Sequence, residues 1–233
     1  MNPNLPIRAL ACDYDETLAC NGRVAAPALE ALARFRASGG KVVLITGREL
    51  NDLLSVCPDL CWFDLVVAEN GALLVRPATE EAEALANRPP EEFVQQLIRR
   101  GVRPLSIGRS IVATVRQHRA TVSQTIADMQ LDLEIILNRS SLMILPTGVH
   151  KGTGLTLALE ELRVPPAQVA GIGDAENDDA FLSLCGCYAA VANALPAIKE
   201  AADLVTDGNC GAGVVEVIDR AMAGDLCRTQ AHR

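Results

Sequence analysis

Two carboxylates, one residue apart, directly follow a largely apolar run near the start of the chain. Residues 7–12 form that run, and Asp13 and Asp15 come after it with Tyr14 between them. Consecutive side chains of a strand point to opposite faces, so Asp13 and Asp15 share a face and can meet one ligand. Buried carboxylates need a compensating cation, and such a pair suits Mg²⁺. The alternative is an exposed acidic turn that caps the next helix, with Thr17 as a local hydrogen-bond partner.

Two further stretches read as buried strands that end in polar side chains. Residues 41–45 are rich in β-branched residues and are followed by Thr46 and Gly47. Residues 169–172 are followed, one residue later, by Asp174. Ligands of open α/β sheets bind outside the carboxyl ends of the strands, near the switch in strand order. We therefore expect an α/β fold with a doubly wound, Rossmann-like parallel sheet whose strand ends form the site.

A lysine completes this set of polar groups. Lys151 stands at the start of a predicted helix, 151–162, where its ammonium can reach a phosphate as a point charge. Taken singly, Thr46 fits a helix cap and Lys151 a solvated helix start. Asp174 and Asp178 equally fit surface acids of a helix. Their common placement at strand ends favours a joint site.

Four motifs occur in a fixed order along the chain: Asp13-x-Asp15-x-Thr17, Thr46 at the end of the second strand, Lys151, and Gly173-Asp174-x-x-Asn177-Asp178. As a set they resemble the haloacid dehalogenase-like phosphohydrolases, and the resemblance covers essentially the whole chain. The run Glu69-Asn70-Gly71-Ala72 and the single large insertion after it are similar to the Cof-type branch. This resemblance implies an α/β cap of subclass IIB between the second and third motifs.

The resemblance implies a role for each residue that handles the phosphate. Asp13 is the expected nucleophile, which attacks phosphorus and forms an aspartyl-phosphate. Asp15 is the expected general acid and base. The expected ligands of the phosphoryl oxygens are Thr46, Gly47 and Lys151.

The resemblance also implies Mg²⁺ as the cofactor. The expected metal ligands are Asp13, the backbone carbonyl of Asp15, and Asp174. Asp178 is expected either to bind the metal as a further ligand or to hold the ligands in place without touching the metal. Glu16 departs from the family pattern, because most of these phosphatases carry glycine there. It either strains a tight turn, adds a carboxylate near the cation, or faces solvent.

The motifs divide the chain into a core and an insertion. Residues 1–75 and 147–233 alternate strands and helices and carry all four motifs, so we expect them to form the core. Residues 76–146 are expected to form the cap. Patterns within the cap predict helices at 91–100 and 120–130 and strands at 106–116, 133–138 and 141–145.

A cluster of arginines in the cap suits an anionic substrate, because guanidinium binds carboxylate or phosphate bidentately. Arg109 and Asn138 are the expected cap contacts to the substrate, ahead of Arg139 and His118.

Three core residues are further candidates for substrate contact or support. Arg48 either meets the substrate or pairs with an acid near the helix start. Asn70 with Gly71 either turns its amide to the cleft or forms a simple hairpin turn. Asn177 lies inside the last motif.

The composition excludes several classes of protein. A formal charge of -8 and 3% aromatic residues argue against nucleic-acid binding. No apolar segment is long enough to span a bilayer, and residues 1–8 lack a signal-peptide pattern, so no membrane association is expected and the protein is predicted to be cytoplasmic. The eight cysteines form no paired C-x-x-C knuckles, and we expect core residues and surface thiols rather than disulfides.

The sequence thus predicts a Mg²⁺-dependent phosphomonoester hydrolase, monomeric or homodimeric. Its expected substrate is a small phosphate ester, either a sugar phosphate or a phosphoglycolate-like acid, beneath a closing cap. One alternative is a phosphomutase of the phosphomannomutase-like kind, which uses the same aspartyl-phosphate. The other is a catalytically silent binding domain.

Overall fold

The computed structural model describes residues 7–226, and a mixed sheet of eight strands runs through its larger part. In spatial order the strands are β14 (Leu204–Val205), β13 (Cys187–Ala190), β12 (Val169–Gly173), β1 (Ala9–Asp13), β4 (Lys41–Ile45), β5 (Leu65–Ala68), β6 (Leu73–Arg76) and β7 (Glu81–Ala84). The strands from β14 to β5 are parallel, whereas β6 and β7 extend the sheet in antiparallel fashion. β1, β5, β12 and β13 are buried along their whole length, so they read as continuous apolar runs.

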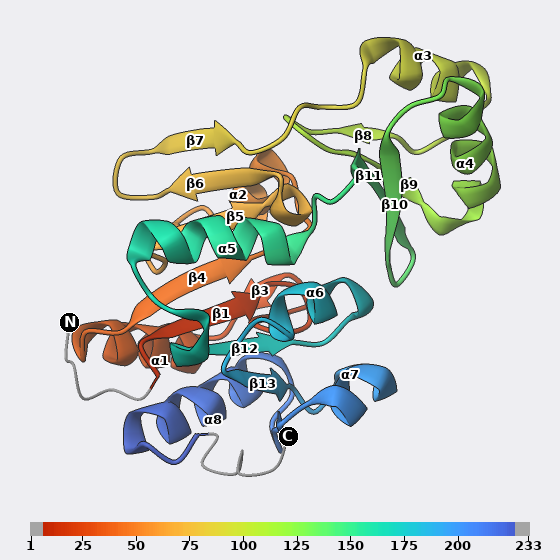
Figure 1. The fold of residues 1–233 in the computed structure, drawn as a ribbon. Helices are drawn as coiled ribbons and strands as arrows, with labels where there is room; N and C mark the ends of the chain where they lie inside the picture. Colours follow the sequence, from red (N-terminus) through yellow and green to blue (C-terminus); the bar gives the residue numbers. More distant parts are fainter. Residues whose placement is uncertain (1–6, 227–233) are drawn as a thin grey trace.

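Helices cover both faces of this sheet. The crossover through α1 (Ala26–Ala37) leads from β1 to β4, and α2 (Leu50–Val56) leads on to β5 in the same direction. The chain returns through α5 (Lys151–Leu162) to β12 on the other side of β1. From there α6 (Asp179–Leu182) leads to β13, and α7 (Pro196–Ala201) leads to β14. Right-handed crossovers in opposite directions place the two sets on opposite faces. α8 (Cys210–Ala223) packs against α1. The predicted doubly wound core is confirmed, and Figure 1 shows α5 lying across the sheet.

A second, four-stranded sheet forms the rest of the structure. Its order is β10 (Leu133–Asn138), β11 (Ser141–Pro146), β9 (Val112–Val115) and β8 (Ser106–Ile107), all antiparallel. The helices α3 (Glu91–Arg99) and α4 (Arg119–Asp128) bury apolar residues against it, among them Phe93, Leu97 and Val122. Figure 1 shows this cap beyond the ends toward which the arrows of β1 and β4 point. Short pieces elsewhere include β2 (Ala19–Cys20), β3 (Arg23–Val24), and the 3₁₀ turns η2 (Arg116–His118) and η3 (Pro166–Gln168).

The segment expected to form the cap differs from its prediction in two places. β7 lies within residues 76–146 but pairs with β6 in the large sheet, so the topology favours a first domain boundary after Ala84. The strand expected at 106–116 is broken into β8 and β9, because the chain reverses at residues 108–111. The division of the chain into domains at 75 and 147 stays a prediction.

The start of α5 is fixed by a capping box. His150 accepts hydrogen bonds from the backbone N–H groups of Gly152 and Thr153, while the Thr153 hydroxyl accepts the N–H of His150. Gly71, with φ of 106°, lies against this start, and a Cβ on it would come within 2.0 Å of the His150 carbonyl. The absence of a side chain at Gly71 therefore lets the first turn of α5, and with it Lys151, enter the core.

Cys20 and Cys210 form a disulfide, which corrects the expectation of free thiols. Cys20 ends β2 and Cys210 begins α8, which packs against β2, so their Cα atoms lie 5.8 Å apart despite a sequence separation of 190. Only the fold brings them together. Cys12, Cys57, Cys61 and Cys185 are free.

Within residues 7–226 no helix has the length and apolar character needed to cross a bilayer. Residues 1–6, most of the segment judged for a signal peptide, lie outside the described part of the chain.

Replacing both Cys20 and Cys210 with serine should destabilise the protein, because the cross-link closes a long loop of the unfolded chain. We expect the free energy of unfolding, measured by guanidinium denaturation, to fall by roughly 2–5 kcal/mol. Cys61→Ser, at an exposed free thiol, is the control and should change it by less than about 0.5 kcal/mol. Equal stability of the double variant and the wild type would contradict the disulfide's structural role.

Candidate functional site

Asp13 and Asp174 lie side by side because the strands that carry them are neighbours. Asp13 ends β1 and Asp174 follows β12, and these strands pair in parallel with Cys12 opposite Ile172. The chain leaves β1 in one direction and later returns to β12 on the other side, so strand order switches here. The structure thus brings the two predicted acids to one point at the sheet's carboxyl edge.

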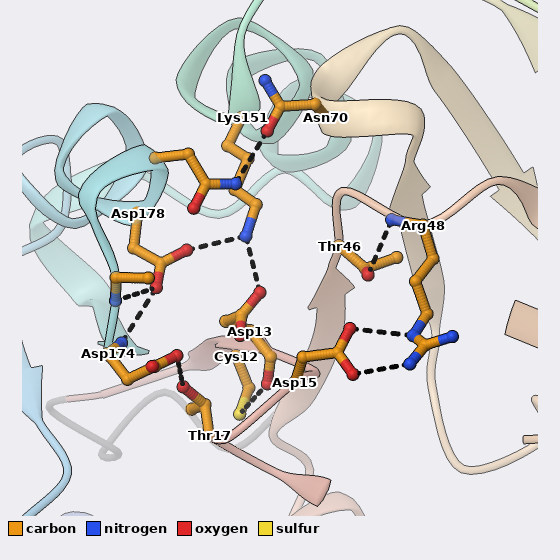
Figure 2. Close-up of polar contacts among 12 residues, drawn as sticks. Cys12, Asp13, Asp15, Thr17, Thr46, Arg48, Asn70, Lys151, Asp174 and Asp178 are labelled. Atoms are coloured by element: carbon orange, nitrogen blue, oxygen red, sulfur yellow. Dashed lines mark hydrogen bonds and ion pairs between the residues drawn. The ribbon is translucent and has the colours of Figure 1, made fainter. Parts of the chain in front are cut away.

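Lys151 is buried between two carboxylates. Its Nζ donates to Asp13 Oδ1 at 2.5 Å and to Asp178 Oδ1 at 2.6 Å, as Figure 2 shows. Only 1% of the lysine is exposed. Burial lowers the pKa of Lys151, but Asp13 and Asp178 outweigh burial and hold the pKa above its ordinary value. The ammonium therefore stays charged.

The carboxylates of this cluster repel one another, and the nearby positive charges compensate them only in part. Burial raises the pKa of Asp13 well above its ordinary value, and the nearby Asp178 and Asp174 raise it further against the opposing effect of Lys151. Burial likewise raises the pKa of Asp174, while Arg139 lowers it. An additional cation in this cluster would relieve the mutual repulsion of the acids.

Further hydrogen bonds orient the carboxylates of Asp178 and Asp174. Asp178 ends η4 (Glu176–Asp178), and its Oδ2 accepts the backbone N–H groups of Asp174 at 2.8 Å and Ala175 at 2.9 Å. Thr17 donates its hydroxyl to Asp174 Oδ1 at 2.9 Å. Each acid is thus oriented by the chain itself, as a preorganised site requires.

Three carboxylates of this cluster can hold a metal ion. Oxygens of Asp13, Asp174 and Asp178 lie within 4.8 Å of one another, and all three residues are buried. Buried, closely spaced oxygen donors fit a hard divalent cation. The side chain of Asp15 is not part of this group.

Asp15 instead pairs with Arg48. The guanidinium donates to both carboxylate oxygens at 2.8 Å, and Figure 2 shows the Asp15 carboxylate turned toward Arg48. Arg48 also contacts Asp52 at 2.6 Å and lies 5.7 Å from the centre of the Tyr14 ring. Hydrogen bonding to Asp15 outweighs burial and raises the pKa of Arg48. Of the two alternatives for Arg48, pairing with an acid is what the structure shows.

Thr46 and Asn70 belong to adjoining turns. Thr46 is buried, and its hydroxyl accepts the backbone N–H of Arg48 at 3.1 Å. Asn70 donates its backbone N–H to the carbonyl of Thr46 at 3.0 Å. It lies in η1 (Glu69–Gly71), the connection between the antiparallel β5 and β6, so the hairpin reading holds, yet its side chain also accepts from Asn177 at 2.9 Å. Asn70 Nδ2 and Asn177 Oδ1 are buried without a partner among the described residues.

A cavity of about 440 Å³ opens between this cluster and the cap. The core lines it with Asp13, Asp15, Gly47, Arg48, Glu49 and Asp52, and the cap with Ser106, Ala113, Asn138, Ser141 and Met143. Within residues 7–226, Asn138 Oδ1 is buried and unpaired. The space suits a small molecule. The sequence analysis missed six of these lining residues, because none belongs to a recognised motif: Glu49, Asp52, Ser106, Ala113, Ser141 and Met143.

The other cap candidates lie in different places. Arg109 lines a separate cavity with Arg88, and His118 donates to the carbonyl of Arg103 at 2.8 Å in the cap. Arg139, ranked behind Arg109 from sequence, reaches the site and pairs with Asp174 Oδ2. It stands in the turn between β10 and β11 with φ of 49°, beside Asn138. The turn of this hairpin is thus the part of the cap nearest to the acids.

Glu16 adopts a left-handed backbone conformation with φ of 59°, which glycine tolerates better. Its carboxylate accepts the N–H of Asn21 at 3.2 Å and lies near Cys20 and Cys210, away from the three buried acids. Glu16 therefore strains its turn and is not a member of the metal cluster.

The chain matches the family model of the haloacid dehalogenase-like hydrolases over residues 10–102 and 109–218. It is 34% identical over 225 residues to phosphoglycolate phosphatase 2 of Saccharolobus solfataricus, covering 93% of both chains. It is 30% identical over 224 residues to the phosphoglycolate phosphatase of Methanothermobacter thermautotrophicus, covering 93% of this chain and 99% of that one.

Solved structures share the fold at lower identity. A haloacid dehalogenase-like hydrolase from Bacteroides thetaiotaomicron superposes with a TM-score of 0.79 at 19% identity, covering 92% of this chain and 99% of that chain. A subclass IIB sugar phosphatase superposes with a TM-score of 0.74 at 20% identity, covering 94% and 100%. These likenesses confirm the predicted core with an inserted cap.

Glu16→Gly should stabilise the protein. Glycine removes the strain of the left-handed backbone, worth about 1–2 kcal/mol, and loses only an exposed hydrogen bond and some chain entropy. We expect a net gain of roughly 0.5–1 kcal/mol in the free energy of unfolding, measured by denaturation. Glu30→Gly, inside helix α1, is the matched control and should lose stability. A loss at Glu16 as large as that at Glu30 would show that the side chain, not the backbone, decides this turn.

Proposed function

This chain belongs to the haloacid dehalogenase-like hydrolase family, and we propose that it hydrolyses phosphoglycolate or a similarly small phosphate monoester with Mg²⁺. The chain is a phosphomonoester hydrolase, as its named relatives are phosphatases. The observation that carries the finer proposal is Asp13, a buried carboxylate that contacts Lys151 and lines the cavity.

Asp13 is the proposed nucleophile. One of its oxygens attacks phosphorus while the bond from phosphorus to the leaving oxygen breaks, which gives an aspartyl-phosphate and an alcohol. Lys151 contacts Asp13 Oδ1, so its fixed positive charge lies where the phosphoryl oxygens must come. Water then attacks the same phosphorus and releases phosphate, leaving Asp13 as it began.

Asp15 is the proposed proton donor to the leaving oxygen and the base for the attacking water. It lines the same cavity as Asp13, and 40% of its side chain is exposed. The bidentate pair with Arg48 fixes the position of its carboxylate before the reaction. Rotation of the Asp15 side chain toward Asp13 would bring the carboxyl to the leaving oxygen of the substrate, to which it gives its proton.

The three buried acids fit the proposed Mg²⁺. Asp13, Asp174 and Asp178 would hold it, together with the backbone carbonyl of Asp15. When bound, the ion would neutralise charge on the phosphoryl group. Lys151 and Arg139 already compensate part of the negative charge of these acids.

The cavity supports a small substrate, and its lining bears on the class. The relatives named as phosphoglycolate phosphatases favour a short phosphorylated acid. Arg48, paired with Asp15 and Asp52, lines the cavity and adds positive charge beside such a carboxylate. Asn138 Oδ1, without a described partner, suits a donating hydroxyl of a sugar phosphate instead. A cytoplasmic location and a monomeric or homodimeric state stay predictions.

Purified protein should release phosphate from phosphoglycolate when Mg²⁺ is present, and Asp13→Asn should lower kcat by at least about 10³-fold. Asp179→Asn, the same change at the exposed first residue of α6, is the control and should keep wild-type activity. Unchanged turnover in Asp13→Asn would refute the assigned nucleophile. Isomerisation of a sugar phosphate without phosphate release would instead establish the phosphomutase.

Mg²⁺ should raise the melting temperature of the wild type, because an ion that binds only the folded state stabilises it. The free energy of unfolding should rise by about 2.7 kcal/mol when the Mg²⁺ concentration is 100 times its dissociation constant. Asp174→Asn removes a charged ligand, and its melting temperature should not respond at the same concentrations. An equal response in both proteins would place the ion elsewhere, and Asp179→Asn serves as the responding control.

A further inference from the structure

A buried carboxylate at the base of the cap has no part in the proposed phosphate chemistry. Glu69 begins η1 directly after β5, and only 1% of it is exposed. Its Oε1 accepts the backbone N–H of Arg109 at 2.9 Å, and its Oε2 accepts those of Ser110 at 2.6 Å and Ile111 at 3.1 Å. A core side chain is thus bonded to three consecutive amides of the cap.

The cap turn is shaped around this carboxylate. Successive N–H groups that converge on one point form an anion-binding nest, and hydrogen bonds to a charged acceptor are the stronger kind. Gly108 donates its N–H to the carbonyl of Ile111 at 2.9 Å, which closes the turn. A Cβ on Gly108 would lie 2.8 Å from Glu69 Oε1, so no larger residue fits there without a shift.

The backbone of the same residue is tied to the phosphate side of the site. Glu69 donates its N–H to the carbonyl of Arg48 at 3.0 Å, next to the bond from Asn70 to Thr46. Glu69 also has φ of 51°, a strained left-handed conformation that only a well-determined environment maintains. One residue therefore connects the catalytic loops with the cap.

The turn at 108–111 lies between two strands that line the substrate cavity. Ser106 in β8 and Ala113 in β9 both face that cavity. At another point of the cap, Arg116 contacts Glu176 of the core at 3.6 Å, and these side chains are 48% and 44% exposed. The Glu69 carboxylate is buried, as is Asp174 where Arg139 of the cap meets it, whereas the exposed contact through Arg116 is the weaker kind.

We propose that Glu69 is a positioning residue that anchors the cap to the core: its carboxylate holds the turn 108–111 and thereby sets Ser106 and Ala113 over the substrate. Only the activity arm of its test rests on the proposed function. The anchor acts on substrate binding and not on the reacting atoms, so its loss should raise KM and leave kcat nearly unchanged.

Glu69→Gln tests the anchor, because an amide nitrogen cannot accept an N–H and one buried donor is left unpaired. We expect amide hydrogen exchange at residues 109–111 to accelerate roughly ten- to hundredfold relative to the wild type. Exchange in β1 and β12 should stay unchanged. The KM for phosphoglycolate should rise roughly tenfold or more with kcat within about twofold.

Glu161→Gln makes the same substitution in an exposed ion pair with Arg76 and should alter neither readout. Gly108→Ala disturbs the nest from the cap side and should reproduce the effects of Glu69→Gln. This second variant tests the anchor even if Glu69→Gln folds poorly. Unchanged exchange at residues 109–111, or faster exchange spread evenly through β1 and β12, would overturn the anchor. A wild type that does not hydrolyse phosphoglycolate would refute the proposed function while the exchange result still decides on Glu69.

Discussion

The rest of the site depends on the ion pairs that the buried ammonium of Lys151 forms with Asp13 and Asp178. The lysine stands at the start of α5, and its ammonium joins this helix to the end of β1 and to η4. Its partners Asp13 and Asp178 lie 138 and 27 residues from it along the chain. Two carboxylates this close and this deeply buried would repel each other without it. The capping box at His150 and the bare backbone of Gly71 serve this contact, because they bring the first turn of α5 to the sheet edge.

The cap contacts the core through charges that differ in burial. Glu69 binds backbone amides in a protected nest, whereas the half-exposed Arg139 reaches down to Asp174 from the turn between β10 and β11. The cavity lies between these two attachments and takes its lining from both parts. Under the proposed function, the cap contributes to substrate selection, while the core carries the phosphate chemistry.

Local patterns predicted what local physics determines. The strands at 41–45 and 133–138 and the helix at 151–162 agree with their predicted bounds, because each has a clear apolar period or cap. The alternation Glu-Ala-Glu-Ala in β7 carries no apolar run, so its place at the sheet edge was missed. The disulfide between Cys20 and Cys210 and the choice of Arg139 over Arg109 depend on tertiary distances. Glu69 lies in the recognised run Glu69-Asn70-Gly71-Ala72, but its contact to the cap leaves no sequence pattern, since its partners are backbone N–H groups.

Trapping the covalent intermediate tests the central claim most directly. Borohydride reduces an acyl phosphate to an alcohol, so an aspartyl-phosphate quenched during turnover becomes homoserine. Peptide mass spectrometry after turnover with phosphoglycolate and Mg²⁺ should find homoserine at position 13, and none without substrate. Turnover that leaves Asp13 unmodified, or that places the modified residue at another carboxylate, would contradict the account.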